Sequence, residues 1–474
     1  MRGLAELAPA YDVAVIGAGP AGLAAATLSA RAGLKTLLLD ENPAPGGQIY
    51  RAITTTPVRR KEVLGADYWL GARLIDEVEA SGAELAMGAL AWSVSRDLEI
   101  GVSMGGGSRL LAARRIILAT GALERPFPVE GWTLPGVMSA GGAQALLKSS
   151  GLVPAGRVVL AGTGPLLWLF AAQLLRAGAA IAAILETTPA ANYLPAVRHL
   201  PAFLCSPYLA KGIALMAQVR GKARVIGGVK GISALGTDQL RQVSFLTQKG
   251  WQREECDHLI LHQGVVPDVN LAMSIGIKHR WDAVQLCFVP ELDGVGNSSV
   301  AGIAVAGDGA GIAGARIAEE RGRLAALAAI GALGGGGFND AASARSIGRS
   351  LSRHARGRSF LDALYRPARP MRVPASDAIL VCRCEEVTAG QIRDAVGLGC
   401  TGPNQVKSFL RCGMGPCQGR QCGLTVTELI AQARGVTPQE VGYYRLRPPI
   451  KPISLGELAT LPEGQAGAAG AVFR

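Results

Sequence analysis

Aromatic and charged residues are both scarce in this sequence. Phe, Trp and Tyr make up 5% of the 474 residues and Asp, Glu, Lys and Arg only 18%, whereas 49% are hydrophobic. This composition excludes a disordered or fibrous chain and suits parallel sheets, whose strands are buried on both faces. The net charge is +12, yet no Lys or Arg block and no nucleic-acid-binding motif is present. We therefore expect no nucleic acid partner, but a basic surface suited to an acidic protein.

The sequence also lacks an export signal and a convincing membrane span. Residues 1–10 include Glu6 and contain no apolar core long enough for export. The apolar stretch at 158–185 is broken by a Gly-Thr-Gly-Pro turn and by Arg176. A strand–turn–helix–strand unit explains these positions better than a membrane helix does. We expect a cytoplasmic protein that is not integral to a membrane.

The first forty residues contain a complete dinucleotide-binding pattern. An apolar run at 12–16 leads into a G-x-G-x-x-G turn and an Ala/Leu-rich helix, and a second apolar run ends at Asp40. The glycines permit a tight turn, let backbone N–H groups approach a pyrophosphate and let the helix pack on the strand. Asp40 can accept hydrogen bonds from ribose hydroxyls. The predicted cofactor-binding residues of this unit are Gly17, Gly19, Pro20, Ala21, Gly22, Asp40 and Glu41.

Three later segments favour a flavin over a nicotinamide in this first site. A glycine pair follows the acid at 45–50, a buried strand ends at Thr120-Gly121, and another strand ends at Gly307-Asp308. Together these elements resemble the flavoproteins with two dinucleotide-binding domains that include glutathione and thioredoxin reductases. The resemblance covers roughly residues 12–325 and implies an α/β fold that binds FAD, with Asp308 on its ribityl or pyrophosphate part. It adds Gly47, Gln48, Thr120, Gly121, Gly307 and Asp308 to the predicted FAD site.

A second dinucleotide pattern at 156–186 has a defect. Its turn is Gly162-Thr163-Gly164, but the third glycine position holds Leu167, where the helix must approach the strand. The resemblance would place NAD(P)H here with Glu186 on its ribose, and the leucine argues against such a site.

Other polar and sulfur-containing residues of the flavin region have structural interpretations. The cysteine pair of disulfide reductases is missing, and Cys205, Cys256 and Cys287 are each expected to be a small buried hydrophobe. His258 and His262 flank an apolar strand and are expected to be polar residues at its edge.

Cysteines are concentrated near the carboxyl end. Six of the nine lie between 382 and 422, which indicates a metal or cluster rather than disulfides. A Cys-x-Cys turn and a glycine-rich loop can surround a cluster with four sulfurs, while glycine N–H groups point at the bridging sulfides. A structural zinc site and inert cysteines are the alternatives.

This cysteine-rich segment resembles the bacterioferritin-associated-ferredoxin-like [2Fe–2S] domain. The resemblance implies that the metal ligands are Cys382, Cys384, Cys417 and Cys422. Cys412 is an undecided fifth candidate, and Cys400 is expected to be structural.

The combination resembles one component of heteromeric amino-acid dehydrogenases, namely the alpha subunit of the opine oxidase and D-hydroxyproline dehydrogenase type. The resemblance rests on the segments 46–51, 411–419 and 444–449. It implies an electron-transfer subunit that takes electrons from an FAD-dependent, amine-oxidising beta subunit. A small ferredoxin-like subunit is a further candidate partner, and an FMN at the subunit boundary, known in proline dehydrogenase relatives, a further candidate cofactor. The alternatives are a free-standing NAD(P)H-dependent flavin and iron–sulfur reductase, and an iron–sulfur binding or sensing protein with a flavin fold as scaffold.

The predicted architecture is α/β, with two Rossmann-like domains and a small helical [2Fe–2S] domain. Gly334-Gly335-Gly336-Gly337 is interpreted as a flexible joint. The expected segments are an FAD-binding domain at 1–148 and 276–335, an NAD(P)-like domain at 149–275, a connector at 336–376, the cluster domain at 377–440 and a tail at 441–474.

Overall fold

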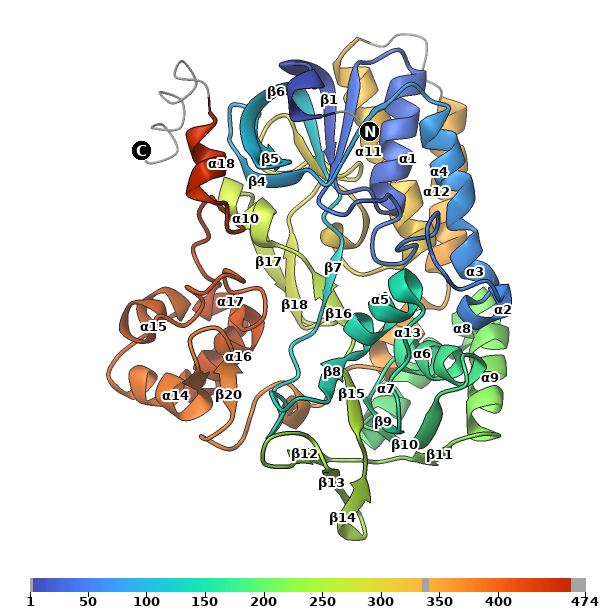
Figure 1. Ribbon diagram of the computed structural model, residues 1–474, viewed down its shortest axis with the longest axis vertical. Helices are drawn as coiled ribbons and strands as arrows, with labels where there is room; N and C mark the ends of the chain where they lie inside the picture. Colours follow the sequence, from blue (N-terminus) through green and yellow to red (C-terminus); the bar gives the residue numbers. More distant parts are fainter. Residues whose placement is uncertain (1–2, 335–340, 462–474) are drawn as a thin grey trace.

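The computed structural model describes residues 3–334 and 341–461. Its upper part in Figure 1 is built on a seven-stranded sheet, and this part is the first dinucleotide domain. The long strand β6 pairs twice, because its first half lies antiparallel to β5 and its second half runs parallel between β1 and β19. The strands are β1 (Ala10–Ile16), β2 (Thr36–Asp40), β3 (Glu84–Met87), β4 (Leu90–Val94), β5 (Glu99–Met104), β6 (Gly107–Leu118) and β19 (Ile303–Val305).

Helices cover one face of this sheet. Helix α1 (Pro20–Arg31) packs against α11 (Ala315–Ala332) and α4 (Gly71–Glu79). The short helices α2 (Lys61–Leu64) and α3 (Ala66–Trp69) lead into α4. On the other side, α10 (Asn270–Ile275) contributes Leu271 and Ile275 to the core.

The second dinucleotide domain is a five-stranded parallel sheet in the order β11, β10, β9, β15, β8. Because β15 lies between β9 and β8, the expectation that His258 and His262 stand at an edge is wrong. The elements are β8 (Val137–Ser139), α5 (Ala140–Ser150), β9 (Arg157–Gly162), α6 (Pro165–Arg176), β10 (Ala180–Glu186), α7 (Tyr193–Val197), α8 (Leu200–Leu204), α9 (Pro207–Arg220), β11 (Arg224–Ile226) and β15 (His258–His262). An antiparallel meander follows β11 and consists of β12 (Gly231–Leu235), β13 (Gln242–Thr247) and β14 (Gly250–Glu255).

The boundaries of the second domain differ from the expected 149–275. Strand β8 and the helix α5 that follows it begin before residue 149, yet β8 pairs with β15 of the second sheet. Helix α10 precedes residue 276, yet it packs into the first domain. The chain crosses between the domains in β7 (Ala122–Glu124) and β16 (Val265–Pro267), which pair with each other. The observed boundaries differ from the expected ones because the chain passes between the domains at β7 and β16, and not at the ends of the sequence motifs.

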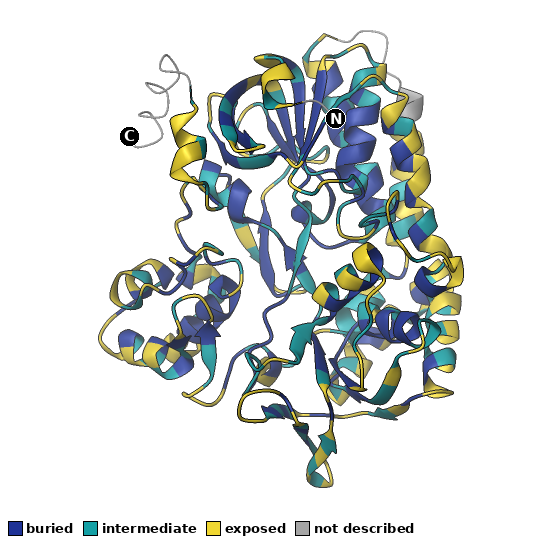
Figure 2. Cartoon of the chain, in the orientation of Figure 1, coloured by how far each residue is buried: buried dark blue, intermediate teal, exposed yellow. Residues whose placement is uncertain are grey.

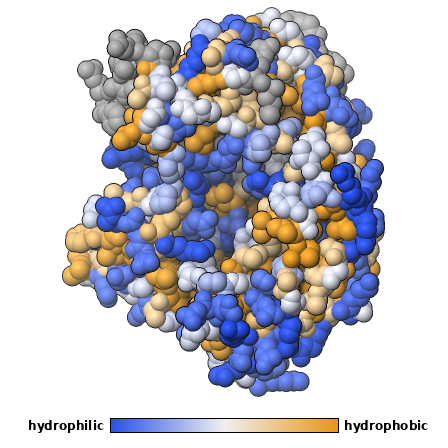
Figure 3. All heavy atoms as spheres, viewed as in Figure 1, coloured by the Kyte–Doolittle hydropathy of each residue, from blue (hydrophilic) through white to orange (hydrophobic). Residues whose placement is uncertain are grey.

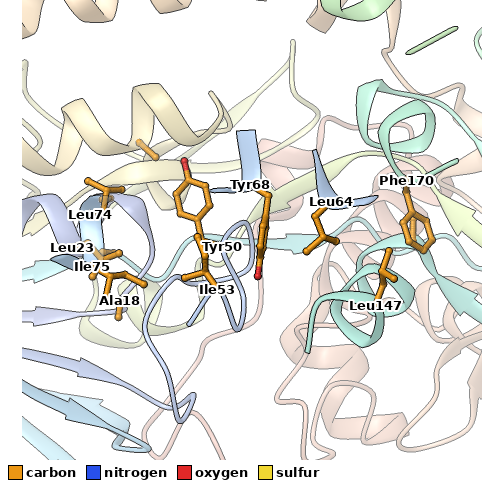
Figure 4. Close-up of a cluster of buried hydrophobic side chains, with 14 of the residues drawn as sticks. Ala18, Leu23, Tyr50, Ile53, Leu64, Tyr68, Leu74, Ile75, Leu147 and Phe170 are labelled. Atoms are coloured by element: carbon orange, nitrogen blue, oxygen red, sulfur yellow. The ribbon is translucent and has the colours of Figure 1, made fainter. Parts of the chain in front are cut away.

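One hydrophobic core runs across the crossing. Figure 4 shows Tyr50, Leu64 and Tyr68 of the first domain lined up toward Leu147 and Phe170 of the second. Figure 2 shows buried residues along the parallel strands and exposed residues on the outer faces of the helices. The two domains therefore share apolar burial in addition to the connecting strands.

The expected connector is folded. Helix α12 (Ala341–Ala355) packs on α11 and buries Ile347, and α13 (Arg358–Leu364) packs on α7. Phe360 of α13 stacks on Phe203 of α8 with ring centroids 4.1 Å apart. These contacts show that the connector is helical. Its few apolar residues recur with a helical period, which lets them pack on the neighbouring helices. Of the predicted glycine joint, residues 335–337 lie outside the described residues.

The cluster domain is small and has its own core, which includes Ile392, Val406 and Leu429. Pro403 begins the second helix, and Gly435 ends the third in the left-handed conformation with φ of 68°. The elements are β20 (Leu380–Cys382), β21 (Val387–Thr388), α14 (Ala389–Gly397), α15 (Pro403–Leu410), α16 (Gly423–Arg434) and α17 (Pro438–Val441). In Figure 1 this domain lies beside α10 and the hairpin of β17 (His279–Asp282) and β18 (Cys287–Pro290).

The tail returns to the first domain. Ile450 is buried in its core, and helix α18 (Leu455–Ala459) brings the Thr460 hydroxyl within 2.7 Å of the Ser108 backbone N–H. None of the helices in the described ranges is both long and apolar enough to span a membrane.

Candidate cofactor sites

The first glycine-rich turn leaves no room for a side chain at Gly17 or Gly22. Gly17 has φ of +108°, and a Cβ on Gly22 would lie 1.7 Å from the Gly17 carbonyl oxygen. A Cβ on Gly47 would lie 2.7 Å from the Cα of Gly19. Two backbone segments therefore meet at the start of α1, where free N–H groups and the helix dipole favour an anion.

Asp40 is fixed at the end of β2 by its own loop. Its Oδ2 accepts the N–H of Ala18 at 2.6 Å, and its Oδ1 accepts the backbone N–H of Asn42 at 2.8 Å. The carboxylate thus braces the glycine turn while it borders the cavity. Glu41 forms an ion pair with Lys451 of the tail.

Asp308 lies where β19 ends. Its Oδ1 accepts the N–H groups of Ala313 and Gly314 at 2.9 and 3.0 Å, just before α11 begins. Arg321 holds the same turn by donating to the carbonyl oxygens of Gly307 and Gly311.

These elements line one continuous cavity of about 1850 Å³. Figure 3 shows the molecule hollowed at its centre, between the cluster domain and the two dinucleotide domains. A small-molecule site usually occupies about 300–1,000 Å³, so this cavity suits an extended dinucleotide and reaches on into the second domain. The sequence-predicted residues that line it are Gly17, Gly19, Pro20, Ala21, Asp40, Glu41, Gly47, Gln48, Thr120, Gly121, Gly307 and Asp308, whereas Gly22 lies behind the turn.

Lys148 on α5 supports the loop at 48–49 that borders this site, and sequence reasoning missed it. Its buried Nζ donates to the carbonyl oxygens of Gln48 and Ile49, both at 3.0 Å, and to Oε1 of Gln144 at 2.9 Å. Burial lowers the pKa of Lys148 to about 7, and the charge of Arg51 acts in the same direction. The lysine fixes the loop after the glycine pair, and no local motif marked it.

The second glycine turn is formed, and its Gly164 and the nearby Glu186 line the same cavity. Leu167 is fully buried in the core beneath α6. The hydroxyl groups of Thr163 and Thr188 form a hydrogen bond of 2.6 Å across the turn. The Thr188 backbone N–H donates to the Glu186 carboxylate at 3.2 Å. Burial raises the pKa of Glu186, although the Thr188 hydrogen bonds oppose the shift.

His262 is buried beside this second turn and was also missed. Its Nδ1 pairs with Glu124 of the crossing strand β7, and the other carboxylate oxygen of Glu124 accepts the N–H of Gly141 at 2.8 Å. This contact joins the two dinucleotide domains at the cavity wall.

Five thiols of the cysteine-rich domain form a group of three and a pair. The sulfur atoms of Cys382, Cys412 and Cys422 lie within 4.8 Å of one another and are buried. Cys384 is exposed and interacts with Cys417. The group of three thus contains two of the predicted ligands, Cys382 and Cys422, together with Cys412, whereas the predicted ligands Cys384 and Cys417 form the pair. Elsewhere, Cys256 and Cys287 are buried as expected, whereas Cys205 is exposed, so its expected burial is wrong. Cys400, which was expected to be structural, is buried.

The environment favours the thiolate form at Cys382 and the thiol form at Cys384, Cys412 and Cys422. Hydrogen bonds from Cys412 and Cys422, together with backbone N–H groups of the loop, lower the pKa of Cys382 to about 2. The hydrogen bond to Cys382 raises the pKa of Cys412 to about 12. The hydroxyl of Tyr444 lies 3.4 Å from the sulfur of Cys412 and 3.8 Å from that of Cys422. The loop glycines are required here, because a Cβ on Gly415 would lie 2.2 Å from the Cβ of Cys384.

Comparison with known families matches both parts of the chain. Residues 11–329 match the pyridine nucleotide-disulphide oxidoreductase family, and residues 380–432 match the BFD-like [2Fe-2S] binding domain. The first match implies FAD-type binding and the second a [2Fe–2S] cluster, in agreement with the glycine turns and the thiol group.

Several characterised proteins are similar over nearly the whole chain. The A-type subunit of opine oxidase from Rhizobium meliloti is 47% identical over 96% of this chain and 89% of its own length. Its counterpart in the opine oxidase of Agrobacterium tumefaciens (strain Ach5) is 46% identical over 96% of this chain and 93% of its own length. Hydrogen cyanide synthase subunit HcnB of Pseudomonas aeruginosa is 32% identical over 94% of this chain and 98% of its own length.

A solved structure has the same fold. L-proline dehydrogenase from P. horikoshii superposes with a TM-score of 0.69 and 21% identity, covering 95% of this chain and 79% of that one. The α/β architecture with two Rossmann-like domains and a helical cluster domain is therefore confirmed.

Proposed function

The chain belongs to the pyridine nucleotide-disulphide oxidoreductase family and, within it, to the relatives of the A-type opine oxidase subunits. On this premise we propose that it is the electron-transfer subunit of a heteromeric amino-acid or opine dehydrogenase. The observation that carries the proposal is the thiol group that lies on the same chain as a dinucleotide cavity. The protein is an oxidoreductase that acts on the CH–NH or CH–NH2 group of donors as part of a complex, and we propose that it works in the cytoplasm.

FAD would be held by the first glycine turn, Asp40, the Gln48 loop and Asp308. Backbone N–H groups at the start of α1 suit the pyrophosphate, and Asp40 stands where ribose hydroxyls can donate to it. Lys148 would keep the Gln48 loop in place beside the ring system. No hydrolytic triad or general base is needed on this chain.

The cluster would be held by Cys382, Cys384, Cys417 and Cys422. Cys412 is close enough to compete with Cys422 for a place beside Cys382. Tyr444 would donate its hydroxyl hydrogen to a cluster sulfur or ligand sulfur, and such hydrogen bonds raise a reduction potential.

When bound, a flavin accepts two electrons and releases them singly, whereas a [2Fe–2S] cluster takes one at a time. This chain would position both cofactors, and an FAD-bearing amine-oxidising beta subunit would supply the electrons. An FMN at the subunit boundary would fit the same scheme, as would a small ferredoxin-like subunit. The substrate-selecting pocket would then lie on the beta subunit.

Co-expression with the amine-oxidising subunit provides the test. The purified complex should contain flavin and roughly two iron and two sulfide per copy of this chain. Under anaerobic conditions, proline, hydroxyproline or an opine should bleach the flavin and then the cluster absorbance. Cys384→Ser should remove most of the iron, whereas Cys205→Ser, at an exposed thiol of the second dinucleotide domain, should retain it. A yellow protein with full flavin content but without iron and sulfide would refute the cluster assignment.

A nicotinamide titration separates this function from a free-standing reductase. Because Leu167 fills the helix–strand contact of the second turn, NADH should reduce the isolated chain far more slowly than the amine reduces the complex. Rapid bleaching of the isolated chain by NADH would favour the reductase instead.

A further inference from the structure

The loop at 417–422 faces the thiol group and the dinucleotide cavity at the same time. Its two end residues are Cys417, which interacts with Cys384, and Cys422, which lies beside Cys382 and Cys412. Between them, Arg420 lines the wall of the cavity. The loop is therefore a direct physical link between the two cofactor sites, which lie in different domains.

Hydrogen bonds fix this loop to the turn that borders the predicted flavin site. Asn270 is buried, and its Nδ2 donates to the Gln418 carbonyl oxygen at 2.9 Å. The Asn270 N–H donates to Oδ1 of Asp268 at 3.2 Å. The backbone N–H of Asp268 donates to the Gly121 carbonyl oxygen at 3.0 Å. The backbone carbonyl oxygen of Asp268 accepts a hydrogen bond from the Thr120 hydroxyl at 3.1 Å. A shift of the cysteine loop would consequently displace the turn at Thr120-Gly121, which borders the predicted flavin site.

Arg420 itself is held at the cavity by the tail. Its Nη1 donates to the Ile450 carbonyl oxygen at 3.0 Å, and the Ile450 N–H donates to the Trp92 carbonyl oxygen at 2.9 Å. Ile450 and Lys451 line the cavity too, and Lys451 pairs with Glu41. Within the described part of the chain, Arg420 forms no ion pair with a carboxylate, although its charge opposes the rise that burial causes in the pKa of Asp268.

We propose that Arg420 is a flavin-binding residue supplied by the cluster loop, so that cluster assembly and flavin retention depend on each other. The inference rests on the proposed function, since it takes FAD as the ligand of the cavity and iron–sulfur as the ligand of the thiols. The physical reason is that FAD carries two negative phosphates, which a guanidinium binds by charge-assisted hydrogen bonds. Loss of the cluster would free the ends of the loop and withdraw this cation from the cavity.

Flavin affinity of the full chain tests the first half of the proposal. FAD would be removed and titrated back while its fluorescence is followed, in the wild type, in Arg420→Gln and in Gln421→Ala, an exposed neighbour on the same loop. Arg420→Gln should weaken FAD binding by about tenfold or more and keep its iron, whereas Gln421→Ala should match the wild type. Unchanged FAD affinity in a folded, iron-containing Arg420→Gln protein would overturn the proposal.

A double-mutant cycle tests the dependence between the two sites. Cys384→Ser removes a thiol that lies outside the loop, so its effect on FAD must pass through the cluster. We expect it to weaken FAD binding in the wild-type background and to add little in the Arg420→Gln background. Fully additive effects would overturn the coupling, as would no effect of Cys384→Ser despite lost iron. Near-ultraviolet circular dichroism verifies that each variant is folded.

The outcomes also separate this inference from the proposed function. A wild-type chain without iron would refute the cluster, yet a weaker affinity of Arg420→Gln for FAD would still support Arg420 as a flavin-binding residue. An iron-containing wild type whose FAD affinity ignores Arg420 would refute the inference and leave the proposed function in place.

Discussion

At the scale of single residues, Gly22 shows how a sequence motif becomes a steric requirement. Its missing Cβ would lie 1.7 Å from a backbone oxygen, which no rotamer change can relieve. We expect Gly22→Ala to abolish FAD binding and to lower the thermal unfolding midpoint strongly. Gly331→Ala is the matched control, because this glycine of α11 has nothing within 4 Å of the added methyl and alanine favours the helix. FAD content and a thermal melt check both variants, and normal FAD content in Gly22→Ala would contradict the assigned role of the turn.

Single residues also mark the limit of sequence reasoning. The glycines and cysteines could be predicted, because their spacing within a short segment is itself the signal. Lys148, His262 and Arg420 could not, because each acts through a partner far along the chain: the loop at 48–49, Glu124, and the tail at 450. Their roles depend on how the domains pack, which local spacing does not encode.

At the scale of elements, local signals explain which helices could be predicted. The helices of the cluster domain begin or end at Pro403 and Gly435, and the two dinucleotide units were marked by their glycine turns. Helices α12 and α13 were taken for a connector, because their Arg- and Ser-rich composition resembles a linker and only a few residues such as Ile347 are apolar. Packing on α11 and α7 supplies the stability that propensity alone does not.

The contact between α4 and α11 depends on a buried carboxylate. Glu319 accepts hydrogen bonds at 2.6 Å from both Arg73 of α4 and Arg323 of its own helix, and its side chain is only 4% exposed. Burial alone would raise the pKa of Glu319, but these two arginines outweigh it and hold the pKa below its usual value. A carboxyl group with a lowered pKa in the folded state stabilises the protein above its unfolded pKa, and this contribution is lost as the pH falls through the folded pKa.

Glu319→Gln should therefore destabilise the protein by about 1–3 kcal/mol at pH 7. The difference from the wild type should shrink as the pH falls below about 4, where the carboxyl group of the unfolded chain takes up a proton, and it should disappear once the folded carboxyl group is protonated at lower pH. Thermal melts across pH measure this, with Glu62→Gln as a control in an exposed ion pair whose loss should leave the midpoint unchanged. A difference that stays constant down to about pH 3 would show that the charge is not the cause.

At the scale of the whole molecule, the cluster domain is attached at several distant points. The Nε1 of Trp132 donates to the Leu380 carbonyl oxygen at 2.8 Å, Asn270 binds the cysteine loop, and the tail continues into the core of the first domain. The sequence predicted three units in the right order, but neither these attachments nor the domain crossing at β7 and β16. Contacts between residues more than a hundred positions apart arise from packing of finished domains, which no short pattern records.

Because the tail carries Ile450 into the flavin-binding domain, the domains should lose their cofactors together. Ile450 is 6% exposed, and its truncation to alanine leaves a cavity that costs about 2–5 kcal/mol in well-packed cores. We expect Ile450→Ala to lower two melting temperatures, that of flavin release, seen as fluorescence, and that of cluster loss, seen as fading absorbance. The two temperatures should fall by similar amounts. Leu455→Ala is the control, since Leu455 lies in the same tail but is 85% exposed. The contrary outcome is that Ile450→Ala releases flavin at a lower temperature than the wild type but loses its cluster absorbance at the wild-type temperature. The domains would then unfold independently, and the tail would be only a local part of the first domain's core.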